Sequence, residues 1–343
     1  MQKIYLITDY KNQFGTKYTA IPYRSGMDKE MLKEEFLNYG IEPLFFNASE
    51  ILEKNHTIKG QLFFYTSSED RQESYKSFLE DVILTIESMN GIPIPRFLYL
   101  RAHNNKVFME LLKKEWGIEV GDKLRSQCFG SYEELIQQEI SLNFPVVVKR
   151  PEGFKSRGVY LAKNIKELKK IASRLSKTRH FKSELKDFIR TFIHKGFRME
   201  SHNRRKFIIQ EFIPGLENDW KILIYGDKYY PLFRRNRKDD FRASGSGLLS
   251  YPKELPDGLL DFAEKAFSYF NVPNISLDIA FDGKDFHIME TQFLYFGTYT
   301  IEHSEFYFRK ESGEWMIVQE KSVLEKEYVR SIVDYLKKNF LLK

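Results

Sequence analysis

Residues 275–293, which read ISLDIAFDGKDFHIMETQF, have the pattern of a β-hairpin that carries acidic side chains. Apolar residues alternate with small or polar ones up to Asp282 and Gly283, which favour a turn, and a second apolar segment follows. Asp278 lies in the middle of the first predicted strand, and Glu290 lies near the end of the second. If pairing brings these two half-buried carboxylates together, they repel one another and lose solvation, so they need a cation.

Gln292 adds an amide oxygen to the same face, because it lies two residues beyond Glu290 on the strand. Oxygen ligands of this kind suit Mg²⁺, which takes one or two carboxylates and completes its shell with water and phosphate. Direct pairing of Asp278 with Glu290 requires a turn with an odd number of residues, such as 283–285. The alternative is a surface hairpin with solvated acids, and the hairpin by itself does not decide between the two.

The composition is that of an ordinary globular protein. A chain of 343 residues can form two or three domains with hydrophobic cores. Its single cysteine, Cys128, excludes a disulfide framework and a thiolate metal cage, which fits a reducing compartment. The first residues lack the layout of a signal peptide, and no apolar segment approaches the roughly 20 residues of a membrane span. We therefore expect a cytoplasmic protein that does not span a membrane.

Residues 1–100 alternate predicted strands and helices, which favours a small, mainly parallel α/β domain. The loop after the first strand contains Lys11, Lys17 and Arg24. In an open α/β sheet, loops at the carboxyl ends of strands face the ligand, so these cations can contact an anionic substrate. The alternative is an exposed basic loop without a ligand.

In residues 144–163, two predicted strands flank a loop rich in Gly, Ser, Lys and Arg. The first of these strands ends at Lys149, and such a loop can cover phosphates with backbone N–H groups and cations. The loop is not a Walker A motif, because a second strand follows it instead of a helix.

Residues 176–206 carry ten basic and three acidic side chains, a balance of +7 compared with +6 for the whole chain. A helix is expected within them, because apolar residues recur at helical spacing: Leu185, Phe188, Ile189, Phe192 and Ile193. The segment is either a solvated insertion or a basic surface for an acidic polymer, nucleic acid or an anionic membrane. No nucleic-acid fold signature accompanies it, so we favour the insertion or an acidic substrate.

The order of the motifs is more specific than any one of them. Lys106 on a predicted helix precedes Lys149, and then come a strand reading QEFI, a D-x-K, a D-F-R before a Gly/Ser loop, and the D…E-x-Q hairpin. This order resembles the ATP-grasp superfamily, and within it the carboxylate–amine ligases similar to glutathione synthetase and the D-alanine ligases. The resemblance covers most of the chain and is clearest over residues 144–293.

The resemblance implies an α/β (α+β) fold of the ATP-grasp type with three parts. An N-terminal α/β pre-grasp domain would span residues 1–100. A lid subdomain would span residues 101–210 and include the basic insertion 176–206. A C-terminal subdomain with the metal-binding hairpin would span residues 211–343.

The resemblance also implies roles for individual residues. ATP binding falls to Lys106, Lys149, Glu152, Gly153, Ser156, Gly158, Glu211, Phe212, Ile213, Glu217 and Asp219, with the choice between the last two open near the ribose. Mg²⁺ or Mn²⁺ falls to Asp278, Glu290 and Gln292, where relatives usually carry Asn in place of Gln. The catalytic residues would be Arg242, Lys149 and Lys221. Apart from the resemblance, positive charge favours contacts of an anionic substrate with Lys11, Lys17, Arg24, Arg234, Arg235 and Arg237, and Ser244 and Gly245 of the Gly/Ser loop are further candidates.

The implied activity is that of an ATP-dependent carboxylate–amine ligase, which forms an amide through an acylphosphate and releases ADP and phosphate. Its carboxylate substrate would be an anionic small molecule, a peptide or a saccharide. The alternatives are an ATP-grasp-type kinase and a non-catalytic nucleotide-binding regulatory protein. Nucleic acid is disfavoured as a partner, and a homodimer is compatible with the sequence.

Overall fold

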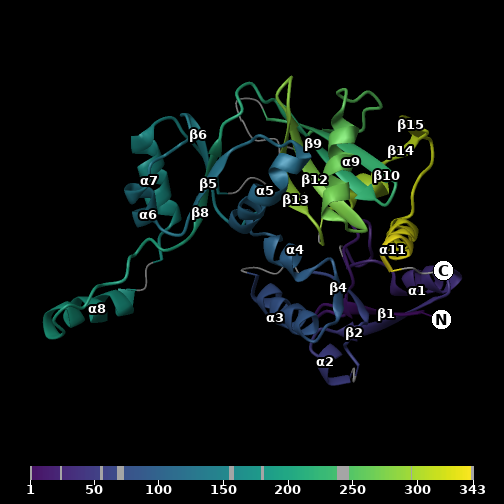
Figure 1. Cartoon of the computed structure of the whole chain (residues 1–343), viewed down its shortest axis with the longest axis horizontal. Coiled ribbons are helices and arrows are strands. Elements are labelled where there is room, and N and C mark those ends of the chain that lie inside the picture. The colour runs from purple at the N-terminus through teal and green to yellow at the C-terminus, as the bar shows by residue number, and fades with distance from the viewer. Residues whose placement is uncertain are drawn as a thin grey trace. The chain divides into compact units, whose positions relative to one another are not determined.

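The computed structural model of the chain (Figure 1) describes residues 2–23, 25–54, 57–67, 73–153, 158–178, 181–237, 247–294 and 296–340. The chain forms two compact units, the first made of Met1–His103 and Glu217–Lys343 and the second of Asn104–Leu216. The predicted three-part division stays a prediction, and each unit is described here by itself. Within the described ranges, no helix combines the length and the apolar composition that crossing a membrane requires.

The first unit begins with a four-stranded sheet of order β2–β1–β3–β4. Its elements in chain order are β1 (Gln2–Thr8), α1 (Lys29–Asn38), β2 (Ile41–Asn47), α2 (Ile51–Lys54), β3 (Leu62–Tyr65), α3 (Ser74–Ser88), β4 (Ile92–Ile94) and α4 (Phe97–Ala102). Every pairing in this sheet is parallel, which confirms the predicted α/β character of this region. The strands of such a sheet are hydrophobic because helices cover both of its faces.

A seven-stranded antiparallel sheet completes the first unit, in the order β13–β12–β9–β10–β14–β15 with β11 beside β10. Its strands are β9 (Asn218–Tyr225), β10 (Lys228–Arg235), β11 (Leu249–Ser250), β12 (Asn274–Phe281), β13 (Phe286–Gln292), β14 (Tyr307–Glu311) and β15 (Glu314–Val318). Its helices are α9 (Leu259–Phe270), α10 (Tyr299–His303) and α11 (Leu324–Phe340). Two-residue turns join β9 to β10 and β14 to β15, and each of these two pairs is antiparallel.

The two faces of this sheet have different roles. On one face, α9 packs against the strands, since Phe262 contacts Phe286 and Phe267 contacts Tyr229 (Figure 1). Side chains alternate between faces, so Leu223 and Tyr225 of β9 lie on the opposite face, where they join a core with β1, β3 and α11. The first residues of β9 share that second face, and there the polar site described below is found.

The second unit is built on a four-stranded antiparallel sheet of order β5–β8–β6–β7. Its elements are α5 (Lys106–Val120), β5 (Ser126–Phe129), α6 (Tyr132–Gln137), β6 (Val146–Lys149), β7 (Val159–Ala162), α7 (Ile165–Leu175), α8 (Phe181–Ile193) and β8 (Phe207–Glu211). A buried core of Val146, Val148, Leu135 and Leu168 joins the sheet to α6 and α7. The two predicted strands around the basic loop are confirmed as β6 and β7, and the helix predicted in the basic segment is confirmed as α8.

The β12–β13 hairpin has the predicted pairing but not the predicted turn. Asp278 lies directly opposite Glu290, as expected. The turn is not the odd-length loop that we expected, because Phe281 pairs with Phe286 and leaves four residues between the strands. The register shifts between Asp278 and Ile279, and this β-bulge returns the two acids to the same face. One extra residue on β13, and not an odd-length turn, therefore places Asp278 and Glu290 on the same face.

Asp282 holds this turn together. Its Oδ1 accepts hydrogen bonds from the N–H groups of Lys284 at 2.9 Å and Asp285 at 2.7 Å, and its Oδ2 lies 3.1 Å from Nε2 of His287. The backbone and histidine contacts lower the pKa of Asp282 from 3.8 to about 2. A carboxyl whose pKa is lower in the folded state stabilises that state above its unfolded pKa, and the contribution disappears as the pH falls toward the folded pKa.

We expect Asp282→Ala to lower the free energy of unfolding by about 1–2 kcal/mol at pH 7, because these hydrogen bonds to a charged acceptor are lost. The difference from the wild type should narrow below pH 4 and vanish near pH 2. Urea unfolding of both proteins across this range measures the difference, with Glu314→Ala at the exposed start of β15 as the control. A difference that stays constant down to pH 2 would contradict the assigned role of the carboxylate.

Candidate functional site

Charged side chains from three neighbouring strands meet on one face of the seven-stranded sheet. The strand register places Lys221 opposite Asp278 and Asp219 opposite Arg234. The Arg234 guanidinium donates to Oδ1 of Asp219 at 2.5 Å and to Oδ2 at 2.7 Å, and its Nη2 lies 2.7 Å from Oδ2 of Asp278. All four side chains are buried. Close pairing is what offsets the cost of removing these charges from water.

Lys221 extends the row to the edge strand β13. Its Nζ donates to Oγ of Ser276 at 2.6 Å, to Oε1 of Gln292 at 3.0 Å and to Oδ1 of Asp278 at 3.5 Å. Ser276 was not among the predicted site residues. It lies two positions before Asp278 on the same strand face, so strand alternation was the signal that pointed to it.

The electrostatics of the row follow from one guanidinium shared by two acids. Burial opposes ionisation of Asp278, but the charges of Arg234 and Lys221 outweigh it and lower the pKa of Asp278. Burial raises the pKa of Asp219, although Arg234 acts against this. Burial also disfavours the charged guanidinium, yet the two acids raise the pKa of Arg234 further, so it stays a cation.

The predicted metal ligands form a suitable but incomplete set of donors. Glu290 pairs with Asp278 and Gln292 pairs with Ser276, so their side chains share one face. Asp278 and Glu290 supply two carboxylates, and Gln292 an amide oxygen, from the strands β12 and β13. Among the described residues, no three His, Cys, Asp or Glu side chains gather as a metal site. Mg²⁺ needs only one or two protein carboxylates when phosphates complete its shell, so these residues fit Mg²⁺ bound together with ATP.

The second unit holds a buried hydrogen-bonded chain around Lys149. Lys149 Nζ donates to Oε1 of Gln210 at 2.5 Å, and Gln210 Nε2 donates to Oε1 of Glu110 at 2.8 Å. Ser126 Oγ then donates to the other oxygen of Glu110 at 2.6 Å. Gln210 and Glu110 were not predicted. The signal for Gln210 was its position as a polar residue directly after the apolar residues FII of β8.

Gln210→Leu would keep most of the side-chain volume but remove both hydrogen bonds. We expect the free energy of unfolding to fall by about 1–3 kcal/mol, because buried polar groups lose their partner. Because Lys149 would lose its hydrogen bond to Gln210, we expect ATP affinity to fall roughly tenfold, which corresponds to one charge-assisted hydrogen bond. Urea unfolding and titration calorimetry with ATP measure the two effects, and Gln137→Leu on exposed α6 is the control. Unchanged ATP affinity in a folded Gln210→Leu protein would contradict this role.

Lys106 ties the start of α5 to the predicted phosphate-covering loop. Its N–H donates to the carbonyl of Pro151, and its Nζ donates to the carbonyl of Gly153, both at 2.9 Å. At the far end of the loop, the N–H of Arg150 donates to the carbonyl of Gly158 at 3.0 Å. Gly158 has a φ of +82°, and a Cβ there would lie 2.9 Å from Cδ of Arg150, so this neck of the loop requires glycine.

Glu211, Phe212 and Ile213, which by the resemblance would contact the adenine edge of ATP through their backbone, directly follow Gln210. The N–H of Glu211 donates to the carbonyl of Arg125 at 3.0 Å, and the Glu211 carboxylate accepts from Nε of Arg125 at 2.6 Å. These bonds occupy the main-chain N–H of Glu211 within the sheet. Reading of an adenine edge by main-chain N–H groups would therefore fall to the next two residues of the prediction, Phe212 and Ile213.

Several other predicted residues have contacts of their own or are exposed. Lys17 Nζ lies 2.8 Å from Oε1 of Glu325, which is fully buried in α11 and also accepts the N–H of Asp28 at 2.9 Å. Lys17 therefore has a structural partner, and its contact with a substrate stays a prediction. The exposed ones include Lys11, Glu152, Glu217, Arg235 and Arg237. Outside the described residues lie Arg24, Ser156, Arg242, Ser244 and Gly245.

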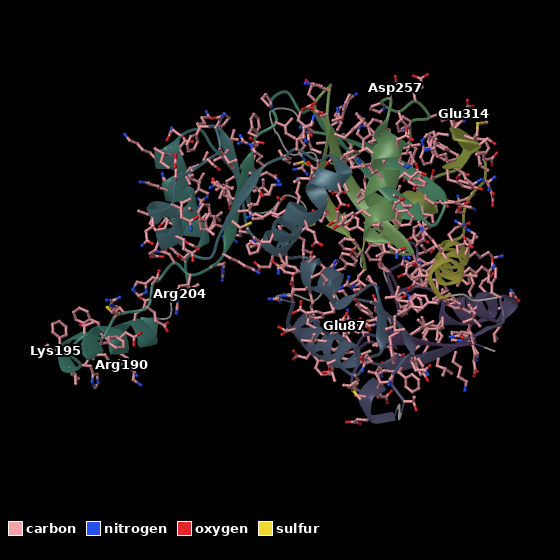
Figure 2. The ribbon with its side chains drawn as sticks, viewed as in Figure 1. Glu87, Arg190, Lys195, Arg204, Asp257 and Glu314 are labelled. Atoms are coloured by element: carbon pink, nitrogen blue, oxygen red, sulfur yellow. The ribbon has the colours of Figure 1, made fainter. Side chains whose placement is uncertain are left out.

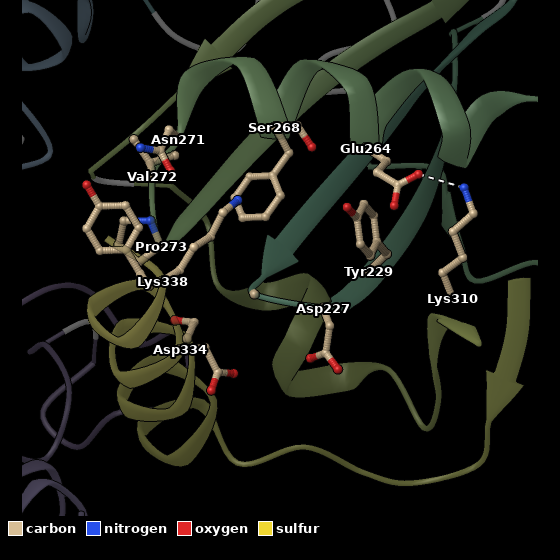
Figure 3. A pocket seen from close by; sticks show the side chains of 14 residues that line it. Asp227, Tyr229, Glu264, Ser268, Asn271, Val272, Pro273, Lys310, Asp334 and Lys338 are labelled. Carbon is tan, nitrogen blue, oxygen red and sulfur yellow. Dashed lines mark hydrogen bonds and ion pairs between the residues drawn. The ribbon is translucent and has the colours of Figure 1, made fainter. Parts of the chain in front are cut away.

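Figure 3 shows a separate cavity of about 430 Å³, lined by residues of α9, α11 and the β9–β10 turn. It contains none of the predicted site residues. Its acids already have partners: Lys310 binds Glu264 at 2.7 Å, and Arg330 contacts both Asp227 and Asp334. The cavity lies beside the C-terminal end of β9, whereas the charged row lies at its start. Nothing about it adds to the site described above.

The chain is similar to proteins of one superfamily. No curated protein sequence matches it, but the family model described as the RimK-like ATP-grasp domain matches residues 102–290. Among solved structures, a complex of N5-carboxyaminoimidazole ribonucleotide synthetase with ADP has a TM-score of 0.55 at 9% identity, covering 97% of this chain and 77% of that one. A D-cycloserine synthetase has a TM-score of 0.54 at 9% identity, covering 98% and 100%. A macrocyclase from Microcystis aeruginosa MRC, bound with a precursor peptide, has a TM-score of 0.51 at 11% identity, covering 96% and 100%.

These structures are less than 25% identical to the chain, so they show its fold and not its substrate. They agree with the predicted ATP-grasp fold, in which an N-terminal parallel sheet accompanies antiparallel sheets. The RimK-like match covers more than half of the chain and includes both Lys149 and the Asp278–Glu290 pair. The chain therefore belongs to the RimK-like ATP-grasp family.

Proposed function

We propose that this protein is an ATP-dependent carboxylate–amine ligase. The observation that carries the proposal is the buried charged row in which Asp278 pairs directly with Glu290, inside a domain matched by the RimK-like model. A fold alone does not imply a function, so the argument rests on these side chains. Two carboxylates and an amide oxygen on one face of the sheet are the oxygen donors that suit Mg²⁺ bound with a polyphosphate.

The proposed reaction has two steps. A carboxylate oxygen of the substrate attacks the γ-phosphorus of ATP, and the bond from that phosphorus to the β,γ-bridging oxygen breaks, which releases ADP. The amine nitrogen then attacks the carbonyl carbon of the acylphosphate, the carbon–oxygen bond to phosphate breaks, and the amine loses a proton. The products are an amide, ADP and inorganic phosphate.

The residues have distinct proposed roles. Lys149, held by Gln210, and Lys106, beside the loop that begins at Gly153, would neutralise phosphate charge in the second unit. Asp278 and Glu290 would hold Mg²⁺ with ATP, and the metal would polarise the phosphoryl oxygens and neutralise their charge. Lys221 would orient Gln292, whose amide oxygen it already contacts. Phosphoryl transfer asks the protein mainly for such positioning and charge neutralisation.

The substrate class we propose is an anionic carboxylate. Arg235 and Arg237 are exposed, and Arg235 directly follows Arg234 of the buried row. Exposed guanidinium groups bind carboxylates and phosphates through paired hydrogen bonds. Amino acids, acidic peptides and uronic acids are the candidates to test first.

The proposal is tested by identifying the products. Purified protein is incubated with ATP, Mg²⁺, a pool of these carboxylates and a pool of amines, and mass spectrometry follows the products. We expect ADP, phosphate and a new amide in equal amounts. Phosphate retained on the product would instead identify a kinase, and release of AMP would rule out the proposed chemistry. No stabilisation by Mg²⁺ and ATP in a thermal shift assay would favour the non-catalytic alternative.

A further inference from the structure

Helix α8 presents an apolar face that the rest of the second unit does not cover. Among its side chains from 184 to 193, none is buried. Phe192 is 76% exposed and Ile193 is 67% exposed. They continue an exposed stripe at helical spacing that also contains Leu185, Phe188 and Ile189. An isolated helix of 13 residues is only marginally stable in water, so this face needs a surface to pack against.

Helix α8 belongs to a segment of the second unit whose two ends lie side by side. The N–H of Thr178 donates to the carbonyl of His202 at 2.8 Å, and the N–H of Arg205 donates to the carbonyl of Ser176 at 3.0 Å. The side chains of α8 from 184 to 193 therefore add nothing to the core of the second unit. No residue of α8 belongs to the site described above.

The apolar stripe is surrounded by cations. Residues 176–206 hold ten basic and three acidic side chains, so the segment carries a balance of +7 while the remainder of the chain is nearly neutral. Figure 2 shows Arg190 on the helix, Lys195 beyond its end, and Arg204 where the chain returns toward β8. An uninterrupted apolar face with basic flanks is the pattern of helices that lie in the interface of an anionic membrane.

We propose that α8 binds the surface of an anionic phospholipid membrane. The side chains of the stripe would enter the boundary between headgroups and acyl chains, and the cations of residues 176–206 would contact the headgroup phosphates. Charge complementarity favours this surface over a second copy of the chain, because two segments of +7 repel one another. Nucleic acid would meet the cations but leave the apolar stripe exposed.

The experiment is flotation of the full-length protein with two kinds of vesicle, phosphatidylcholine alone and phosphatidylcholine with phosphatidylglycerol. We expect the wild type to float with the anionic vesicles only, and less so at high salt. Phe188→Glu with Phe192→Glu should weaken binding by more than about tenfold, because two large apolar side chains no longer enter the membrane. The matched control is Leu111→Glu with Ile118→Glu, which makes the same charge change at exposed apolar positions of α5. The affinity of this control for anionic vesicles should be within about twofold of the wild-type affinity.

A second readout follows the helix itself. Phe192→Trp places an indole on the stripe, and its emission should shift to the blue when anionic vesicles are added, after subtraction of the wild-type signal. Lys195→Gln with Arg198→Gln should weaken binding by roughly fivefold per cation. Circular dichroism and thermal unfolding confirm that each variant is folded.

Four results would overturn the proposal. The first is that the folded wild type does not float with either vesicle. The second is equal binding to both vesicles. The third is equal loss in the Phe188/Phe192 variant and in the α5 control, which would make the effect one of net charge. The fourth is a dimer in light scattering that depends on Phe192 and forms without any vesicle binding. Such a dimer would show that the stripe packs against a second copy of the chain.

Discussion

Glu290→Gln is expected to reduce Mg²⁺-dependent ATP binding by more than roughly 100-fold. Loss of a residue that only supports a metal ligand typically costs 10–100-fold in affinity, and Glu290 is proposed to be a ligand itself. Glutamine keeps the size of the side chain and removes one negative charge. Asp278 would then be the only acid of the pair, and it already contacts Arg234 and Lys221. The Asp278–Glu290 pair would carry one negative charge instead of two, so it would attract a divalent cation less strongly.

The measurement is titration calorimetry with ATP at fixed Mg²⁺, repeated with EDTA. The wild type should lose affinity in EDTA, whereas Glu290→Gln should bind ATP weakly in both conditions. Once an acceptor is known, amide formation should be abolished in the same variant. Glu314→Gln, which replaces an exposed acid at the start of β15, serves as the control and should behave as the wild type. If Glu290→Gln keeps its Mg²⁺-dependent affinity, the metal assignment to the hairpin is wrong.

Arg234→Met is expected to lower the free energy of unfolding by about 3–5 kcal/mol, which is the usual cost of removing one partner from a buried ion pair. Arg234 is the cation that both Asp219 and Asp278 contact, and all three side chains are buried. Methionine would fill much of the space but would leave Asp219 and Asp278 without their shared guanidinium, and Lys221 would then be the remaining cation of the described row. Their repulsion and desolvation would favour either protonation or local unfolding of β9 and β10.

Denaturant unfolding at pH 7 with EDTA measures this loss without a contribution from bound metal. The neighbouring Arg235→Met provides a close control, because Arg235 is exposed and should change stability by less than about 0.5 kcal/mol. Arg234→Met combined with Asp219→Leu should recover part of the loss, since an apolar pair can replace a buried ion pair. The coupling between the two positions then follows from a double-mutant cycle. A loss below 1 kcal/mol for Arg234→Met would show that the guanidinium does not hold the row together.

The two predictions separate ligand binding from folding. Glu290 is only partly buried at the edge of the row, so its substitution should change metal and ATP binding more than stability. Arg234 lies within the row and should change stability first. The opposite pattern would exchange the proposed roles of the two residues.

The sequence by itself determined most of the elements and the order of the site motifs. Periodicity of two and of 3.6 residues depends only on neighbours along the chain, and so the β9–β10 hairpin, the strands around the basic loop and α8 were all predictable. The family was predictable for a related reason. Lys106, Lys149, Asp278 and Glu290 appear in a fixed order with the right residue types, and that order survives without knowledge of any contact.

Only the tertiary structure decided how those residues are held. The bulge that aligns Asp278 with Glu290 is a register choice between strands, and the four-residue turn would have suggested the opposite face. The contact of Lys149 with Gln210 and the contact of Arg234 with Asp278 join strands that are far apart in the sequence. Burial creates these contacts, because a charge that leaves water must find a partner on whichever strand lies beside it. The sequence determines which side chains are present and in what order, and tertiary packing determines which of them contact one another.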